Sequence, residues 1–158
     1  MSAYPRTSPW GEVQHCEMLI DGVFLVSTAG HGGVMVRKGA AGFLSPDARK
    51  IGQSERNYLS FEEDCEEQVV IRELLDKKLW ELPSRIADKA GYVESIDRLL
   101  IRWQPDYWGK RERRLEAEAD AKNTPVLASR LESGKSRVAE RNAANIPTEY
   151  KHRSAEAR

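Results

Sequence analysis

The sequence predicts an α+β fold, in which a small antiparallel sheet of three to four strands packs on two main helices and a charged helical extension follows. Two β-prone runs joined by Asp21-Gly22 indicate a hairpin. Two later stretches carry apolar residues at helical spacing. Large apolar residues become sparse after Gly109. We therefore expect a core domain at residues 8–108 and a partly flexible, charged helical extension at residues 109–158.

Charge and hydropathy exclude several classes of protein. The 158 residues include 25 basic and 25 acidic side chains, so the formal net charge is zero. A non-specific nucleic-acid binder usually carries a clear basic excess. No stretch approaches the roughly 20 apolar residues of a membrane-spanning helix, and no secretory signal opens the chain. We expect a cytoplasmic protein with two reduced cysteines and no membrane contact.

The zero net charge hides an uneven distribution along the chain. Residues 61–108 carry twelve acidic and seven basic side chains, whereas residues 109–158 carry eight acidic and twelve basic ones. Charge of one sign on a surface steers partners of the opposite sign toward it. The distribution therefore favours a protein that recognises charged partners.

The predicted strands come first. Val13–Ile20 and Val23–Thr28 form the hairpin, with a type I′ turn at Asp21-Gly22, because that turn needs positive φ at both central residues. Val34–Val36 reads as a third strand. Residues 57–61 are expected to add one more short strand.

The predicted helices follow. Residues 45–52 begin with serine, proline and aspartate, which favour an N-cap and first turn, and end at glycine. Ser60 and Glu63 have the spacing of a capping box, so the longest core helix is expected to begin after Ser60. A second main helix is predicted at about residues 84–103, with a break or bend at Gly91.

A histidine flanked by glycines is the first candidate site. His31 lies in the segment 27–33, where the glycines let a ligand approach the backbone closely. Imidazole acts as a general acid, a general base or a metal ligand. The plainer interpretation, which we favour, is a tight turn with a solvated histidine.

A run of carboxylates is the second candidate site. Five acids in six positions suit a divalent cation or a shared proton. The alternative, which we favour, is that they are solvated acids at a helix N-terminus, where the helix dipole stabilises them. The five residues are Glu62, Glu63, Asp64, Glu66 and Glu67.

The cysteines and histidines suggest two further hypotheses. Cys65 is a candidate nucleophile with His31 or His15 as its base, although a buried thiol on the apolar side of the helix is the favoured interpretation. The four residues His15, Cys16, His31 and Cys65 suit zinc by type, but their spacing matches no familiar zinc module. We therefore predict no metal and no cofactor.

The basic residues of the extension are the last candidates. Arg111, Arg113 and Arg114 are able to contact phosphate groups. Interleaved glutamates favour a salt-bridged, solvated helix instead. Contact between the tail and nucleic acid is one of the hypotheses that the sequence leaves open.

Three segments carry a resemblance to a known family. Ser8-Pro9-Trp10-Gly11, the segment 27–33 and the segment 61–65 occur in an order that resembles a family of small proteins known only as a domain of unknown function. Its members are typically encoded on phages, plasmids and integrative elements. The resemblance covers about residues 8–105 and implies that the histidine and carboxylate segments meet in space. The positions that carry over are His31, Glu62, Glu63, Asp64 and Cys65.

The resemblance implies no reaction, and the chain departs from the family pattern at one place. Glu66 and Glu67 stand where more aromatic or apolar character is expected. Any partner surface shared with the family is therefore open to question at these two positions.

These observations lead to one main hypothesis. The chain is expected to be an accessory protein of a mobile genetic element that binds a host protein or ribonucleoprotein complex and inhibits or redirects it. A nucleic-acid-targeting defence system is the expected type of target, as for anti-CRISPR or anti-restriction proteins. The sequence predicts no oligomeric state. The candidate binding residues are Trp10, His31, Glu62, Glu63, Glu66, Glu67, Arg111, Arg113 and Arg114.

The alternative hypothesis is a small hydrolase-like enzyme. It would use His31 with Glu62, Glu63 and Asp64, and either Cys65 or a metal ion. The spacing of these residues in the sequence does not match any complete catalytic set. A DNA-associated regulatory protein that binds through residues 109–158 is the third hypothesis.

Overall fold

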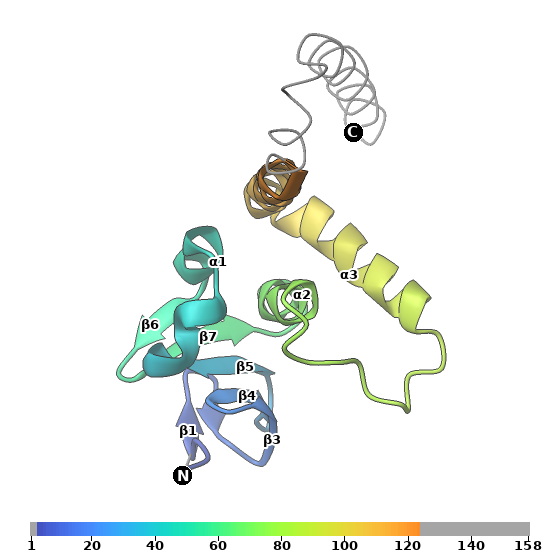
Figure 1. Ribbon diagram of the computed structural model, residues 1–158. Coiled ribbons are helices and arrows are strands. Elements are labelled where there is room, and N and C mark those ends of the chain that lie inside the picture. Colours follow the sequence, from blue (N-terminus) through green and yellow to red (C-terminus); the bar gives the residue numbers. More distant parts are fainter. Residues whose placement is uncertain (1–2, 124–158) are drawn as a thin grey trace, which may run out of the picture. The chain divides into compact units, whose positions relative to one another are not determined.

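The computed structural model describes residues 3–123 and confirms the α+β fold class (Figure 1). The main sheet is antiparallel and has five strands rather than three or four, in the order β3-β4-β5-β7-β6. A separate two-stranded ladder lies near the N-terminus. The strands are β1 Thr7–Ser8, β2 Gly11–Glu12, β3 His15–Ile20, β4 Val23–Ser27, β5 Gly32–Arg37, β6 Gln53–Glu55 and β7 Tyr58–Glu62.

Helix α2 contacts the sheet on one side and packs against α3. The described residues fall into two units that divide between Arg111 and Glu112. The predicted division after residue 108 stays a prediction, and the part of the extension beyond residue 123 lies outside the described residues. The helices are the 3-10 helix η1 Lys38–Phe43, α1 Pro46–Ile51, α2 Glu67–Asp76, α3 Lys89–Trp103 and a helix at 105–123.

The predicted hairpin is present, but its turn differs from the prediction. β3 and β4 pair antiparallel, with Ile20 opposite Val23. Gly22 has φ +83°, whereas Asp21 is not among the residues with positive φ. The turn is therefore not type I′, which needs positive φ at both positions. The pairing register shifts between Met18 and Ile20, and such an irregularity changes the turn that can close the hairpin.

The prediction that a helix begins after Ser60 is wrong. Ser60 lies inside β7 with 1% of its surface exposed, and α2 begins only at Glu67. β7 pairs with β5 at five positions and places Phe61 in the core with no exposed surface. A helix cap contributes about 1 kcal/mol, which is less than the free energy of burying a Phe side chain, about 1.5–3 kcal/mol. The short strand predicted at residues 57–61 is the element that forms.

The sheet is covered on both faces. One face contributes Val34 and Phe61 to a large apolar core that also contains residues of α2 and α3. On this side of the sheet, α2 lies next to the strands and α3 packs on α2 (Figure 1). On the second face, Phe24, Val26 and Met35 form a smaller core. A sheet that is buried on both faces positions the strand ends rigidly, and the candidate site lies at those ends.

α3 begins later than predicted, because Asp88 caps it. The Asp88 carboxylate accepts a hydrogen bond from the Gly91 backbone N–H at 2.9 Å. Gly91 therefore belongs to the first turn of the helix and does not interrupt it. The helix ends at Trp103, and a new helix begins at residue 105. Tyr107, in its first turn, is 3% exposed and belongs to the main core.

A buried carboxylate fixes α2 against the connection between the sheet and α1. Glu73 has no exposed surface and accepts hydrogen bonds from the Ser45 backbone N–H at 3.1 Å and from the Ser45 hydroxyl. Lys77 lies 2.7 Å from the same carboxylate. The Ser45 hydroxyl also accepts from Ala48 N at 3.2 Å, which confirms Ser45 as the N-cap of α1. One carboxylate thus joins α2 to the start of α1.

Replacing Glu73 should lower stability. Glu73→Gln keeps the shape of the side chain but removes the charge-assisted hydrogen bonds, and such bonds contribute about 1.5–3 kcal/mol. We expect the free energy of unfolding, measured by urea denaturation, to fall by about this amount. The matched control is Glu94→Gln, which breaks an exposed helical pair with Arg98 and should cost less than about 0.5 kcal/mol. Equal losses in the two variants would contradict this role for Glu73.

Candidate functional site

The histidine and carboxylate segments meet at the ends of two neighbouring strands. The Glu63 backbone N–H donates to the Gly32 carbonyl at 2.9 Å, because β5 and β7 are paired up to this point. His31 Nδ1 lies 3.5 Å from Glu63 Oε1. The side chains of His31 and Glu63 are 64% and 41% exposed. The prediction that these segments are neighbours is confirmed, and the pair lies on an open surface.

A threonine holds the histidine turn in place. The Thr28 hydroxyl donates to the His31 carbonyl at 2.7 Å and accepts from the His31 backbone N–H at 3.2 Å. The same hydroxyl lies 3.4 Å from the Trp10 carbonyl. The turn is therefore supported by its own side chain and touches the N-terminal motif as well. All three segments that carry the family resemblance come together here.

The two glycines after His31 have a structural explanation. A Cβ atom on Gly32 would lie 2.6 Å from the Val26 carbonyl oxygen. A Cβ atom on Gly33 would lie 2.1 Å from the Phe61 carbonyl oxygen and 2.6 Å from the Trp10 ring. All three distances are far below van der Waals contact. The glycines are thus required by the close approach of strand backbone and of Trp10, whose ring packs on the smaller core.

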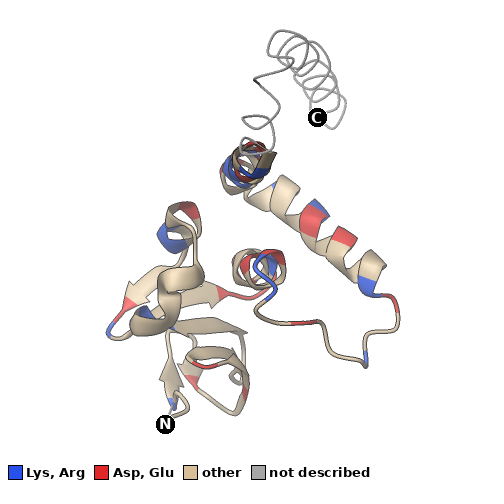
Figure 2. Ribbon diagram, in the orientation of Figure 1, with Lys and Arg blue, Asp and Glu red and all other residues tan. Residues whose placement is uncertain are grey.

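The five carboxylates surround the turn between β7 and α2 rather than lining one face of a helix. Residues 63–66 join β7 to α2, and Asp64 adopts φ +73° there. Glu66 Oε2 accepts a hydrogen bond from the Glu62 backbone N–H at 3.1 Å, which stabilises the turn. Figure 2 shows acidic colouring at this junction beside a largely uncharged sheet. We call this group the acidic corner; its members are Glu62, Glu63, Asp64, Glu66 and Glu67.

Glu67 has the most perturbed acidity in the corner. Burial raises the pKa of its carboxyl group, and the negative charges of Glu63 and Asp64 raise it further, to about 7. A hydrogen bond from the Asp64 backbone acts in the opposite direction but is outweighed. Near neutral pH this side chain therefore exists in both protonation states. A carboxyl group with this property is able to gain or lose a proton when a charged ligand binds.

Cys65 lies in the turn before α2 and not on its apolar side, so the predicted helical position of this residue is wrong. It is a half-buried free thiol. Across residues 3–123, no group of three His, Cys, Asp or Glu side chains is placed to hold a metal ion. The hydrolase hypothesis built on His31 and these acids stays a prediction.

Arg111 is part of the core. Its guanidinium donates two hydrogen bonds of 2.7 Å to the Asp76 carboxylate, and its Cζ lies 4.5 Å from the centre of the Trp108 ring. Burial alone would lower the pKa of the guanidinium, but the hydrogen bonds and charge of Asp76 raise it above its usual value. This placement corrects the expectation that Arg111 lies on a solvated helix, and its candidate role as a phosphate contact stays a prediction. Arg113 is exposed and Arg114 is half-buried, and their role stays a prediction.

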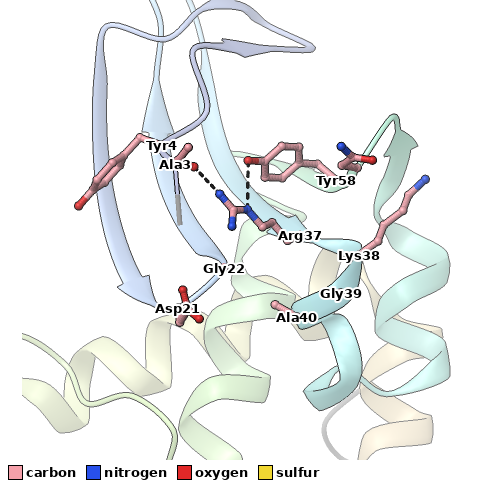
Figure 3. Close-up of a pocket in the computed structure, with 10 residues that line it drawn as sticks. Ala3, Tyr4, Asp21, Gly22, Arg37, Lys38, Gly39, Ala40 and Tyr58 are labelled. Carbon is pink, nitrogen blue, oxygen red and sulfur yellow. Dashed lines mark hydrogen bonds between the residues drawn. The ribbon is translucent and has the colours of Figure 1, made fainter. Parts of the chain in front are cut away.

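A hollow near the N-terminus was not indicated by any sequence motif. It has a volume of about 640 Å³ and is framed by Arg37, which Figure 3 shows pointing toward Ala3 and Tyr58. Arg37 donates to the Ala3 carbonyl, and its Nε lies 3.5 Å from the Tyr58 hydroxyl. The only signal in the sequence is the pair of cations Arg37 and Lys38 directly after an apolar run. These contacts fasten the N-terminal segment to β5, so we assign Arg37 a structural role.

Alanine at Gly33 should disturb the site and the fold together. The added Cβ would collide with the Phe61 backbone, and forcing extra volume into packed structure costs about 1–3 kcal/mol. We expect the urea midpoint of Gly33→Ala to fall accordingly. Gly30→Ala is the matched control, because a Cβ atom there meets nothing within 4 Å. A Gly33→Ala protein as stable as the wild type would contradict the steric explanation.

Stability should depend on pH through Glu67. Its folded pKa of about 7 exceeds the unfolded value near 4.5, so the folded state binds more protons between these values. This group therefore lowers stability as pH rises from about 4.5 to 7. Glu67→Gln should be more stable than the wild type at pH 8, with the advantage vanishing near pH 4.5, as measured by urea denaturation. The exposed Glu81→Gln should show no such pH-dependent difference.

Comparison with known proteins identifies a family but no characterised relative. No curated protein and no solved structure matches the chain. A family model described as a domain of unknown function (DUF7007) matches residues 3–148. The match reaches well beyond the span of 8–105 that carries the resemblance in the sequence motifs. The chain therefore belongs to the DUF7007 family of domains of unknown function.

Proposed function

We propose that this chain is a binding protein that docks on a basic surface of a host protein or ribonucleoprotein complex through its acidic corner. The observation that carries the proposal is the concentration of five carboxylates around one connection of the chain, where burial, and then like charge, raise the pKa of Glu67 to about 7. Repulsion of this kind destabilises the free protein. A cationic partner would relieve it, so part of the binding free energy comes from neutralising the corner.

The corner is accessible and ordered by backbone contacts. Glu62 and Asp64 are exposed, and Glu63 is partly exposed beside His31. The backbone of the corner is hydrogen-bonded to β5 through the Glu63 N–H, and the Glu66 side chain accepts a hydrogen bond from the Glu62 N–H. A surface that is ordered before binding loses less conformational entropy when a partner arrives. These features support recognition by a defined protein surface rather than by loose ionic attraction.

The finer part of the proposal concerns the target. The chain would be encoded by a mobile genetic element and would inhibit or redirect a nucleic-acid-targeting defence complex of its host. Such complexes hold nucleic acid in positively charged grooves. A carboxylate cluster competes with phosphate groups for basic side chains of this kind. The support for this step is charge complementarity, together with the resemblance of the sequence motifs to proteins of mobile elements.

Charge reversal tests the proposal. Glu62→Lys combined with Asp64→Lys replaces two exposed acids of the corner, and we expect it to abolish retention of the host partner in affinity purification from the organism that encodes the chain. The matched control reverses two exposed acids elsewhere, Glu12→Lys and Glu55→Lys, and changes the net charge equally. Retention should also weaken as salt concentration rises.

Two results would overturn this function. One is that the wild-type chain retains no stable partner and gives no protection to a phage or plasmid challenged by the host. The other is that the two double variants behave alike, because this would show that net charge and not the corner drives association.

A further inference from the structure

A small groove begins where the acidic corner ends. It has a volume of about 90 Å³ and is walled by β3, β4, α2 and the segment that leads into α3. Because a water molecule occupies about 30 Å³ of liquid volume, the groove has room for roughly three waters. This volume suits the end of one side chain. Glu67 belongs both to the corner and to the wall of the groove.

One side chain that lines the groove carries a buried acceptor without a donor. Gln68 is 9% exposed, and its side-chain oxygen has no hydrogen-bond partner in the part of the chain that the structure describes. Its side-chain nitrogen donates to Glu67 Oε1 at 3.3 Å, so the amide is already oriented. Leaving a buried acceptor unpaired costs free energy. A ligand that donates a hydrogen bond would recover this free energy.

The other side chains that line the groove favour a hydrogen-bond donor with a positive charge. Glu17 and Glu67 add carboxylate oxygens, and the aromatic rings of Trp80 and Tyr92 line the same groove. Carboxylates accept hydrogen bonds, and aromatic faces attract cations. The one cationic residue among the lining side chains is Arg85, which is exposed. The groove therefore favours a compact, positively charged donor over an anion or a neutral acceptor.

We propose that this groove receives the ammonium group of a lysine side chain from the partner protein. The inference rests on the proposed function and names the chemistry of the contact. An ammonium group carries three donors, and three acceptor side chains line the groove: Glu17, Glu67 and Gln68. The aliphatic stem of lysine packs on apolar walls while its charged end is bound. Lysine fits better than arginine, whose planar guanidinium needs a wider, fork-shaped set of acceptors.

Binding should be linked to protonation of Glu67. Burial, and then the charges of Glu63 and Asp64, raise the pKa of this carboxyl group. The other charged side chains that line the groove are Glu17 from the sheet and Arg85 from the loop. An ammonium ion favours the ionised carboxylate. Lysine binding should therefore tighten as pH rises through about 7 and weaken below it.

The test uses the full chain and a small probe with a free side-chain ammonium group, Nα-acetyl-lysine methylamide. The matched control is the same molecule with its side-chain nitrogen Nε acetylated as well. The indole N–H signal of Trp80 is followed by NMR and assigned with a Trp80→Phe variant. We expect saturable shifts with the amine probe and none with the acetylated one. The exposed Trp103 indole should not respond, which separates groove binding from general attraction.

Three variants sharpen the result. Gln68→Leu should weaken the probe about tenfold, as expected for loss of one hydrogen bond to a charged group. The same change removes an unpaired buried acceptor and also the hydrogen bond to Glu67, so the thermal midpoint is measured beside the titration to show that the variant is folded. Glu67→Gln should weaken binding and abolish its pH dependence. Arg85→Ala should tighten binding, because a like charge leaves the groove.

The outcomes separate this inference from the proposed function. Equal binding of the acetylated probe, tighter binding of the arginine analogue, or unchanged binding by Gln68→Leu would overturn the lysine assignment. The titration needs no partner protein. Probe binding with no retained partner would therefore reject the proposed function alone, whereas partner retention without probe binding would reject the groove.

Discussion

The architecture depends on how the α2 helix is held against the sheet, and the buried Glu73 carboxylate is central to that. Burying a charge is unfavourable unless it is paired and hydrogen-bonded. Here Ser45 and Lys77 satisfy it from the α1 cap and from the end of α2 itself. Because Glu73 fixes the far end of α2, the near end is also fixed, and that end carries Glu67 and Gln68. The contacts of Glu73 with Ser45 and Lys77 thus fix the position of the acidic corner and of the groove, although none of these three residues is part of either.

Local signals were sufficient for part of the fold and misleading elsewhere. The hairpin and the Ser45 cap could be predicted because the turn dipeptide and the capping residue act within a few positions of the chain. The helix expected after Ser60 does not form there, because Phe61 is required by the sheet core. Capping-box spacing describes a local preference, whereas strand pairing with β5 involves residues some 25 positions away. Tertiary packing decided between them.

The candidate site was predictable only in outline. The proximity of His31 and Glu63 followed from a resemblance to a family, since nothing in their spacing requires it. The role of the two glycines and the buried position of Arg111 depend on which backbones and side chains lie opposite them. The groove beside Gln68 requires knowing how four separate elements meet. None of these facts is encoded in a pattern along the chain.

The contact of Arg111 with Asp76 has a consequence for where the folded core ends. Asp76 also lies 3.6 Å from Arg72, which in turn lies 3.2 Å from Asp97 of α3. Ending the polypeptide just after Trp108 would remove Arg111 from this row of alternating charges. The carboxylates of Asp76 and Asp97 would then face a single guanidinium, that of Arg72. The smallest autonomous fragment should therefore extend at least to Arg111, past the point where the composition changes.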